Sequence, residues 1–69
     1  MKTMIAQRLL PGDHIVRDSV TIRLERVEVT HKAPVIVFGI PEGGTDVVRI
    51  SFSFDELARL GEPRHRAAA

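Results

Sequence analysis

The chain has 69 residues, of which 43% are hydrophobic and 28% are charged, and its net charge is +1. This length accommodates one small soluble domain and excludes a second one. Cysteine is absent, which rules out disulfides, cysteine-ligated zinc and a thiol nucleophile. A packed core must therefore supply the stability, helped by any self-association.

Neither a membrane span nor a signal peptide is predicted. The longest purely apolar run, Val35 to Phe38, is far shorter than the roughly 18 residues that a transmembrane helix needs. Near the N-terminus, Gln7 and Arg8 interrupt the apolar residues before about 7 of them accumulate, the minimum for a signal-peptide core. We therefore expect a cytoplasmic protein.

The first predicted elements are a lead segment, a turn and a short strand. Residues 5–10 lead into Pro11-Gly12-Asp13, where proline presets φ and glycine supplies the positive φ of a type II turn. A short strand is expected over 14–17. Asp18-Ser19 then forms a turn or bend before the next run.

The segment 20–29 alternates between apolar and polar residues, as a strand with one buried face does. The apolar positions change phase at Glu25: they are Val20, Ile22 and Leu24 before it, and Val27 and Val29 after it. One extra residue in an antiparallel strand is a β-bulge, which curves the sheet. We favour a bulge over a tight turn at Glu25-Arg26, because neither Gly nor Asn is present to adopt positive φ.

Two further strands are predicted on either side of a loop. The run from Val35 to Ile40 is apolar throughout and rich in β-branched residues, which is typical of a strand buried on both faces. Residues 41–45 contain one proline and two glycines and form a hairpin connection. Beyond them, residues 47–54 alternate in polarity and predict another strand.

The end of the domain is predicted to be a helix of about two turns. Ser53 and Glu56 match a capping box, and Leu57 and Leu60 would then pack on the sheet. Gly61 followed by proline ends it. The domain is expected over 3–61, with a flexible basic and alanine-rich tail over 62–69 whose alanines resemble cloning-vector residues.

Together these elements predict a hydrophobic core. Its members are apolar residues on the buried side of each strand or of the helix: Ile15, Ile22, Leu24, Val27, Val29, Ile36, Phe38, Val48, Ile50, Phe52 and Leu57.

Few residues are arranged to carry chemistry. The three histidines are widely spaced, which argues against a zinc site. Asp13 and His14 are neighbours on a strand and so point to opposite faces, unsuited to acid–base work. Ser53 is explained as a cap, and Gly43-Gly44 lacks the Lys-Ser/Thr ending and the helix of a phosphate loop. We therefore expect no enzyme, no metal and no cofactor.

The charge pattern leaves a nucleic-acid function open as an alternative. Eight arginines accompany two lysines, a bias that indicates G+C-rich coding DNA. On the strand 20–29 cationic and acidic residues cancel one another, as on a solvated face. A small nucleic-acid-binding regulator would use the remaining cations together with that strand, namely Arg17, Arg23, Arg26, Lys32 and Arg49.

The stretch Leu9-Leu10-Pro11-Gly12-Asp13-His14-Ile15-Val16, followed by β-rich sequence, resembles the opening of small SH3-like barrels, of the kind found in short proteins of high-G+C bacteria and their phages. The resemblance covers most of residues 5–54. It implies a mainly β, antiparallel, partly open barrel of about five strands, and a binding module whose function lies in surface loops. The same turn occurs in Hint and intein domains, but this chain lacks their cysteine and is about half their size.

The resulting functional hypothesis is a non-enzymatic adaptor or regulator that docks on a protein partner. The predicted contacts are Val35 and Val37, if their strand lies at a sheet edge, and Glu42 and Thr45 in the loop that follows. A homo-oligomeric structural protein is a further alternative.

Overall fold

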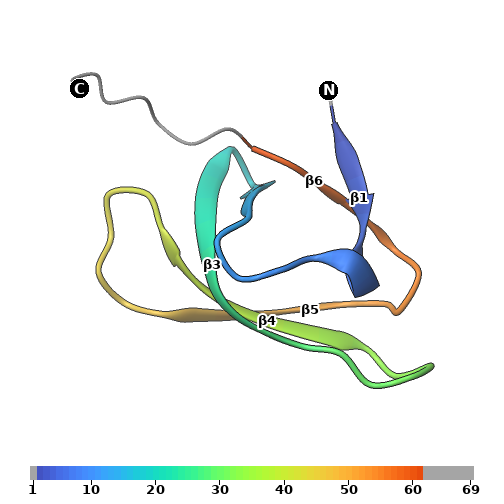
Figure 1. Ribbon diagram of the computed structural model, residues 1–69. Helices are drawn as coiled ribbons and strands as arrows, with labels where there is room; N and C mark the ends of the chain where they lie inside the picture. Colours follow the sequence, from blue (N-terminus) through green and yellow to red (C-terminus); the bar gives the residue numbers. More distant parts are fainter. Residues whose placement is uncertain (1, 62–69) are drawn as a thin grey trace.

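The computed structural model describes residues 2–61. These residues form six strands and one 3-10 helix: β1 (Thr3–Ile5), η1 (Ala6–Arg8), β2 (His14–Arg17), β3 (Val20–Glu28), β4 (Val35–Pro41), β5 (Val48–Phe52) and β6 (Leu57–Arg59). Four of them make an antiparallel sheet in the order β2-β3-β4-β5, and β1 pairs with β6 (Figure 1). The prediction of a mainly β, antiparallel fold is confirmed.

The two sheets are joined by backbone contacts of the residues that directly follow β6. Ile15 of β2 forms an antiparallel bridge with Leu60, and the Gly61 N–H donates to the His14 carbonyl over 2.8 Å. The strands therefore follow one another around an open, curled half-barrel (Figure 1). In the part of the chain that the structure describes, β1 and β5 are the two ends of this curl and do not pair.

The turn predicted at Pro11-Gly12-Asp13 is present and is fastened to the sheet. Gly12 has φ +96°, and the Asp13 N–H donates to the Leu10 carbonyl over 3.1 Å, as in a type II turn. The Asp13 carboxylate also accepts from the Leu10 N–H at 2.9 Å. Leu24 of β3 binds both sides of the turn, because its carbonyl accepts from Gly12 and its N–H donates to Asp13, each over 2.8 Å.

A two-residue hairpin connects β2 to β3, because Arg17 pairs with Val20. The intervening Asp18 and Ser19 have φ +52° and +66°. Two consecutive positive φ values define a type I′ turn, whose twist matches that of the strands it joins. The turn predicted here is confirmed, although it contains no glycine.

The predicted β-bulge is also confirmed. The register of β3 against β4 shifts between Leu24 and Arg26, leaving Glu25 as the extra residue. The bulge changes which residues of β3 face the core: Leu24 is buried before it, and Val27 packs against the core after it. A bulge bends and twists its strand, which accounts for the curl of the long β3 (Figure 1).

The prediction of a C-terminal helix is wrong, because residues 57–59 form a strand. Residues 53–56 form a single turn, in which the Glu56 N–H donates to the Ser53 carbonyl over 3.0 Å and the Glu56 carboxylate accepts from the Ser53 N–H over 2.9 Å. The chain then extends as β6, with Leu57 opposite Ile5 and Ala58 opposite Met4. A helix of two turns is marginal on its own, whereas β1 offers this segment a ladder of backbone hydrogen bonds.

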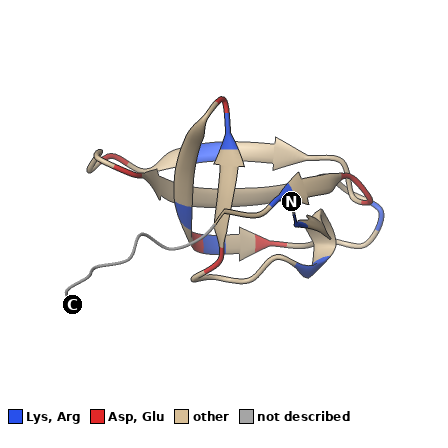
Figure 2. Ribbon diagram, turned by 90° about the horizontal axis from the view of Figure 1, so that it is seen from above, with Lys and Arg blue, Asp and Glu red and all other residues tan. Residues whose placement is uncertain are grey.

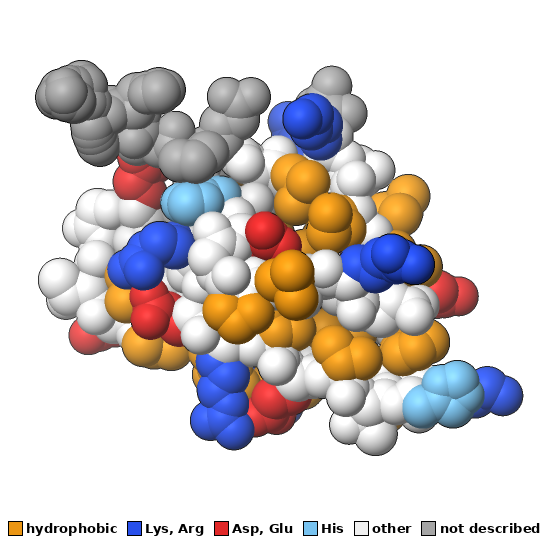
Figure 3. Space-filling model, in the orientation of Figure 1, with side chains coloured by type: hydrophobic (Ala, Val, Ile, Leu, Met, Phe, Trp, Pro, Cys, Tyr) orange, Lys and Arg blue, Asp and Glu red, His pale blue; other side chains and the backbone are white. Residues whose placement is uncertain are grey.

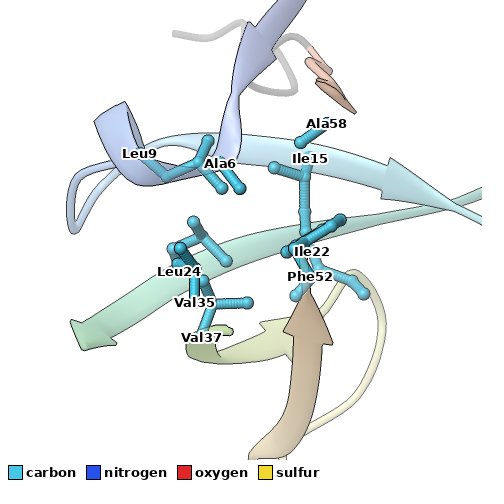
Figure 4. Packing of buried hydrophobic residues seen from close by; sticks show 9 residues of the cluster. All are labelled: Ala6, Leu9, Ile15, Ile22, Leu24, Val35, Val37, Phe52 and Ala58. Carbon is cyan, nitrogen blue, oxygen red and sulfur yellow. The ribbon is translucent and has the colours of Figure 1, made fainter. Parts of the chain in front are cut away.

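Buried side chains from η1, from Leu9 directly after it, and from β2 to β6 meet in one core (Figure 4). Its members are Ala6, Leu9, Ile15, Ile22, Leu24, Val35, Val37, Phe52 and Ala58. Ile15, Ile22, Leu24 and Phe52 confirm the prediction, and Val27, Val48 and Ile50 pack against this cluster while half-buried. Ala6 and Leu9 face the side chains of β3 and β4 across the interior (Figure 4).

Four predicted core residues lie elsewhere. Val29 follows the end of β3 and is 47% exposed, and Leu57 is 62% exposed because β6 turns Ala58 inward instead. On β4 the inward residues are Val35 and Val37, so Ile36 and Phe38 lie on the opposite, outer face and are half-buried there. The tail predicted over 62–69 lies outside the described residues.

Candidate functional site

A pocket lies on the outer face of the four-stranded sheet, where β2 and β3 meet the turn that leads to β5. It has a volume of about 240 Å³ and combines aliphatic, hydroxyl, imidazole and charged side chains. The lining residues are His14, Thr21, Arg23, Ile40, Pro41, Glu42 and Gly44. We refer to this set as the outer pocket.

Strand register brings these residues together. Ile15 and Ile22 are paired and point inward, so their neighbours His14 and Arg23, which are also paired, point outward. Arg23 in turn pairs with Ile40 of β4. One row across three strands therefore supplies the imidazole, the guanidinium and the apolar floor of the outer pocket.

A tight turn closes the far side of the outer pocket. The Gly44 N–H donates to the Pro41 carbonyl over 2.9 Å, and Gly43 has φ +85°, a value that glycine adopts without cost. The Glu42 N–H donates to the Thr21 carbonyl over 2.8 Å. This bond fixes the turn against β3, so the pocket wall is held by the backbone as well as by side chains.

Two cations of β3 on the outer face are paired within their own strand. The Arg23 guanidinium lies 2.6 Å from the Glu25 carboxylate, and Arg26 lies 2.6 Å from Glu28. All four side chains are between 40% and 69% exposed, and exposed pairs of this kind contribute only about 0–1 kcal/mol. A partner group that reaches Arg23 therefore displaces Glu25 at little energetic cost.

Of the predicted protein-binding residues, two are buried in the core and two lie on the surface. Val35 and Val37 are fully buried, and β4 is paired on one side with β3 and on the other with β5. The condition for binding at this strand, an open sheet edge, is therefore not met, and both side chains lie in the core. Glu42 and Thr45 do lie in an exposed turn, and Glu42 lines the outer pocket.

The predicted nucleic-acid-binding cations do not form one group. Arg23 and Arg26 of β3 point to the outer face, where Arg26 also covers the Phe38 ring at 5.5 Å. Arg49 of β5 is paired with Phe38 and so lies on the same face. Arg17 instead lies 5.6 Å from the ring of Phe52, a core residue, and Lys32 lies in the β3–β4 turn with φ +61°.

Neither sign of charge dominates the described surface. Residues 2–61 contain eight Lys or Arg and eight Asp or Glu. Acidic and basic positions alternate around the ribbon (Figure 2), and on the face shown in Figure 3 both signs surround a group of hydrophobic side chains. A phosphate backbone would thus meet no continuous basic stripe among these residues.

Two features of the outer face were missed in the sequence. Ile36, Phe38 and Ile40 form an apolar row along β4 that ends in the outer pocket. His14, for which the sequence pattern favoured an exposed position beside a turn, is half-buried in the pocket wall. The signal for the row was the phase of the β4 alternation, which an entirely apolar segment does not reveal.

The residues and volume of the outer pocket limit what it can hold. Among residues 2–61, no three His, Asp or Glu side chains gather to hold a metal ion. The volume of the pocket is below the about 300–1,000 Å³ of cofactor and drug-sized ligand sites, and instead suits one or two side chains. The pocket combines apolar side chains with a few polar groups, and in binding sites of this composition the polar groups orient the bound group.

No family model, no curated protein and no solved structure matches the chain. In the described part of the chain, no helix has the length and apolar character needed to cross a membrane.

Proposed function

We propose that the protein is a non-enzymatic binding module that docks on a protein partner through the outer pocket. The observation that carries the proposal is the pocket itself, which is lined by the apolar Ile40 and Pro41 together with the polar Thr21, Arg23 and His14. We assign as occupant an aliphatic side chain of an extended partner segment. The backbone of that segment then lies within reach of the polar rim.

The apolar row of β4 extends this site. Ile36, Phe38 and Ile40 are each half-buried, and Arg26 stacks on the Phe38 ring. An extended segment that anchors one side chain in the outer pocket continues along this row and covers it. The protein would act as an adaptor by presenting a rigid sheet face. The turn beside the pocket is held by two backbone hydrogen bonds, from Gly44 to Pro41 and from Glu42 to Thr21.

The proposal is tested with a phage-displayed library of random 12-residue peptides, selected against the full-length protein. Enriched peptides should carry an aliphatic residue and should shift the amide resonances of Thr21, Arg23 and Ile40 when added to the ¹⁵N-labelled protein. Enrichment of no peptide, or shifts confined to another face, overturns the proposal. If the protein instead binds a DNA or RNA oligonucleotide with an affinity that falls steeply as salt is raised, the partner is a nucleic acid and not a protein.

A matched pair of variants locates the binding site. Arg23 and Arg26 both lie on β3, and each pairs with a glutamate two residues further on at 2.6 Å. Only Arg23 lines the outer pocket. Arg23→Gln should weaken peptide binding about tenfold or more, as the loss of a charged hydrogen bond does, and Arg26→Gln should weaken it less. Equal effects of the two variants contradict a pocket-centred site.

A further inference from the structure

Strand β5 is an open edge of the four-stranded sheet. It pairs with β4 along one side, and no other strand among residues 2–61 pairs with its second side. The opposite end of the half-barrel is β1, a strand of only three residues. With five residues, Val48–Phe52, β5 is the longer of the two open ends.

Strand β5 lacks most of the usual protections of an edge strand. Natural edges carry charged side chains, above all lysine, or proline, a bulge or an inward-pointing charge, which prevent another strand from adding to them. The sequence Val-Arg-Ile-Ser-Phe contains no proline and a single charge, Arg49, and its ladder with β4 is regular over all five residues. Its inward residues Val48, Ile50 and Phe52 are all apolar.

The core is unfinished beside this edge. Phe52 is 6% exposed, but Val48 and Ile50 are only half-buried, because the half-barrel is open there. A strand added to β5 would place apolar side chains next to both of them. Burial of the exposed apolar area is the driving force for such an addition.

We propose that the strand added to β5 is β5 of a second copy, in antiparallel orientation about a two-fold axis at Ile50. Ile50 then faces Ile50, Val48 of one copy faces Phe52 of the other, and Arg49 faces Ser51. Each inward residue meets an apolar inward residue, and no two like charges lie directly opposite, a contact that would be destabilising. A symmetric dimer needs a surface that is complementary to itself, and β5 meets that condition.

Other registers are worse. A shift by one residue sets the apolar face of one strand beside the polar face of the other. An axis at Arg49 places the two Arg49 guanidinium groups directly opposite. An axis at Ser51 leaves three pairs within β5, because Arg49 then faces Ser53 in the turn that follows the strand. The Ile50 register alone uses all five residues without a direct charge clash.

The expected dimer is weak and depends on salt. A single pair of five-residue strands buries less than the about 1,200–2,000 Å² of stable protein interfaces, so association is reversible. In this register Arg49 of one copy and Arg49 of the other are diagonal neighbours on either side of the central Ile50 pair, about 7–8 Å apart. Arg49 is exposed. Salt screens this repulsion, so the dimer should tighten as salt is raised.

The test is sedimentation equilibrium of the full chain over a range of concentrations, with charge variants at Ser51. Ser51 is exposed, so its substitution leaves the fold intact, which circular dichroism verifies. Ser51→Glu places a carboxylate opposite Arg49 in both halves of the dimer and should lower the dissociation constant roughly 2- to 30-fold. Ser51→Lys should raise it by a similar factor, so that a smaller fraction of the protein is dimeric at each concentration.

Two controls keep the result specific. Thr30→Glu and Thr30→Lys make the same charge changes at an exposed residue of the β3–β4 turn and should leave the dissociation constant unchanged. Arg23→Gln, which tests the outer pocket, should also leave it unchanged. A monomer at every concentration, or a dimer that responds equally to the Ser51 and Thr30 variants, overturns the proposal and leaves the outer pocket untouched.

Discussion

Gly39 of β4 and Ile22 of β3 lie so close together that a β-carbon on Gly39 would be 2.6 Å from Ile22 Cγ2. The same β-carbon would be 2.7 Å from the carbonyl oxygen of Arg23, a backbone atom that no rotamer change can move away. Gly39 pairs with Leu24, immediately before the bulge. The absence of a side chain at this position lets the two strands approach where the sheet curls.

Gly39→Ala should therefore destabilise the protein by about 1–3 kcal/mol, as overpacking in a core does. Urea unfolding followed by circular dichroism measures this loss. Gly44→Ala is the matched control, because its nearest non-neighbouring atom, the Pro41 carbonyl oxygen, would lie 3.4 Å away and the residue is exposed. Equal stabilities of the two variants would show that β3 and β4 separate easily at Gly39.

The bends and turns of the fold were predictable from local chemistry. Proline and glycine marked the type II turn at Gly12, and the change of apolar phase at Glu25 marked the bulge. The phase of β4 was not predictable in this way. Every residue from Val35 to Phe38 is apolar, so period-two alternation has no polar residue to show which side faces water, and the register with β3 decides it.

The C-terminal strand shows how tertiary pairing overrides a local signal. Ser53 and Glu56 make one half of the predicted capping box, since the Glu56 carboxylate does bind the Ser53 N–H. The helix does not continue, because Leu57 to Arg59 pair with β1, and the Ala6 N–H donates to the Glu56 carbonyl over 2.8 Å. Partners fifty or more residues away cannot be deduced from the spacing of Leu57 and Leu60.

Substitutions in β6 distinguish the strand from a helix. Leu57 is 62% exposed and Ala58 is 2% exposed, so Leu57→Ser should change the free energy of unfolding by about 0.5 kcal/mol or less. Ala58→Leu should cost about 1–3 kcal/mol, since the core has no room for the added atoms. Thermal and urea unfolding of both variants provide the measurement. The reverse order of the two effects would support a helix with Leu57 in the core.

The type I′ turn between β2 and β3 offers a stabilising change. Ser19 has φ +66°, a conformation that costs an L-residue roughly 1 kcal/mol or more and costs glycine much less. Ser19→Gly should raise the free energy of unfolding by about 0.5–1 kcal/mol, after the greater flexibility of glycine in the unfolded chain is included. Ser53→Gly, at a residue without positive φ, is the control and should not stabilise. A loss of stability in Ser19→Gly would contradict the turn type.

The residues of the outer pocket were only partly predictable. Arg23 and Glu42 each appeared as candidates, but for different functions and with no indication that they meet. They come together because Arg23 pairs with Ile40, and because the Glu42 N–H binds the Thr21 carbonyl. Both contacts depend on the register of β3 against β4, which the bulge at Glu25 shifts by one residue and which composition alone does not determine.

Asp13 should stabilise the N-terminal turn through its side chain. Its carboxylate accepts from the Leu10 N–H at 2.9 Å, and the turn is bound on both sides by Leu24. Asp13→Ala should cost about 1 kcal/mol, the typical net contribution of one hydrogen bond, whereas Asp13→Asn keeps an acceptor and should lose less. Asp46→Ala, in the exposed β4–β5 loop, is the control. The Asp13 carbonyl also accepts from the Leu24 N–H. Hydrogen exchange at the Leu24 amide should therefore accelerate in Asp13→Ala and stay slow in Asp46→Ala. Unchanged exchange in both variants would show that the backbone alone fixes the turn.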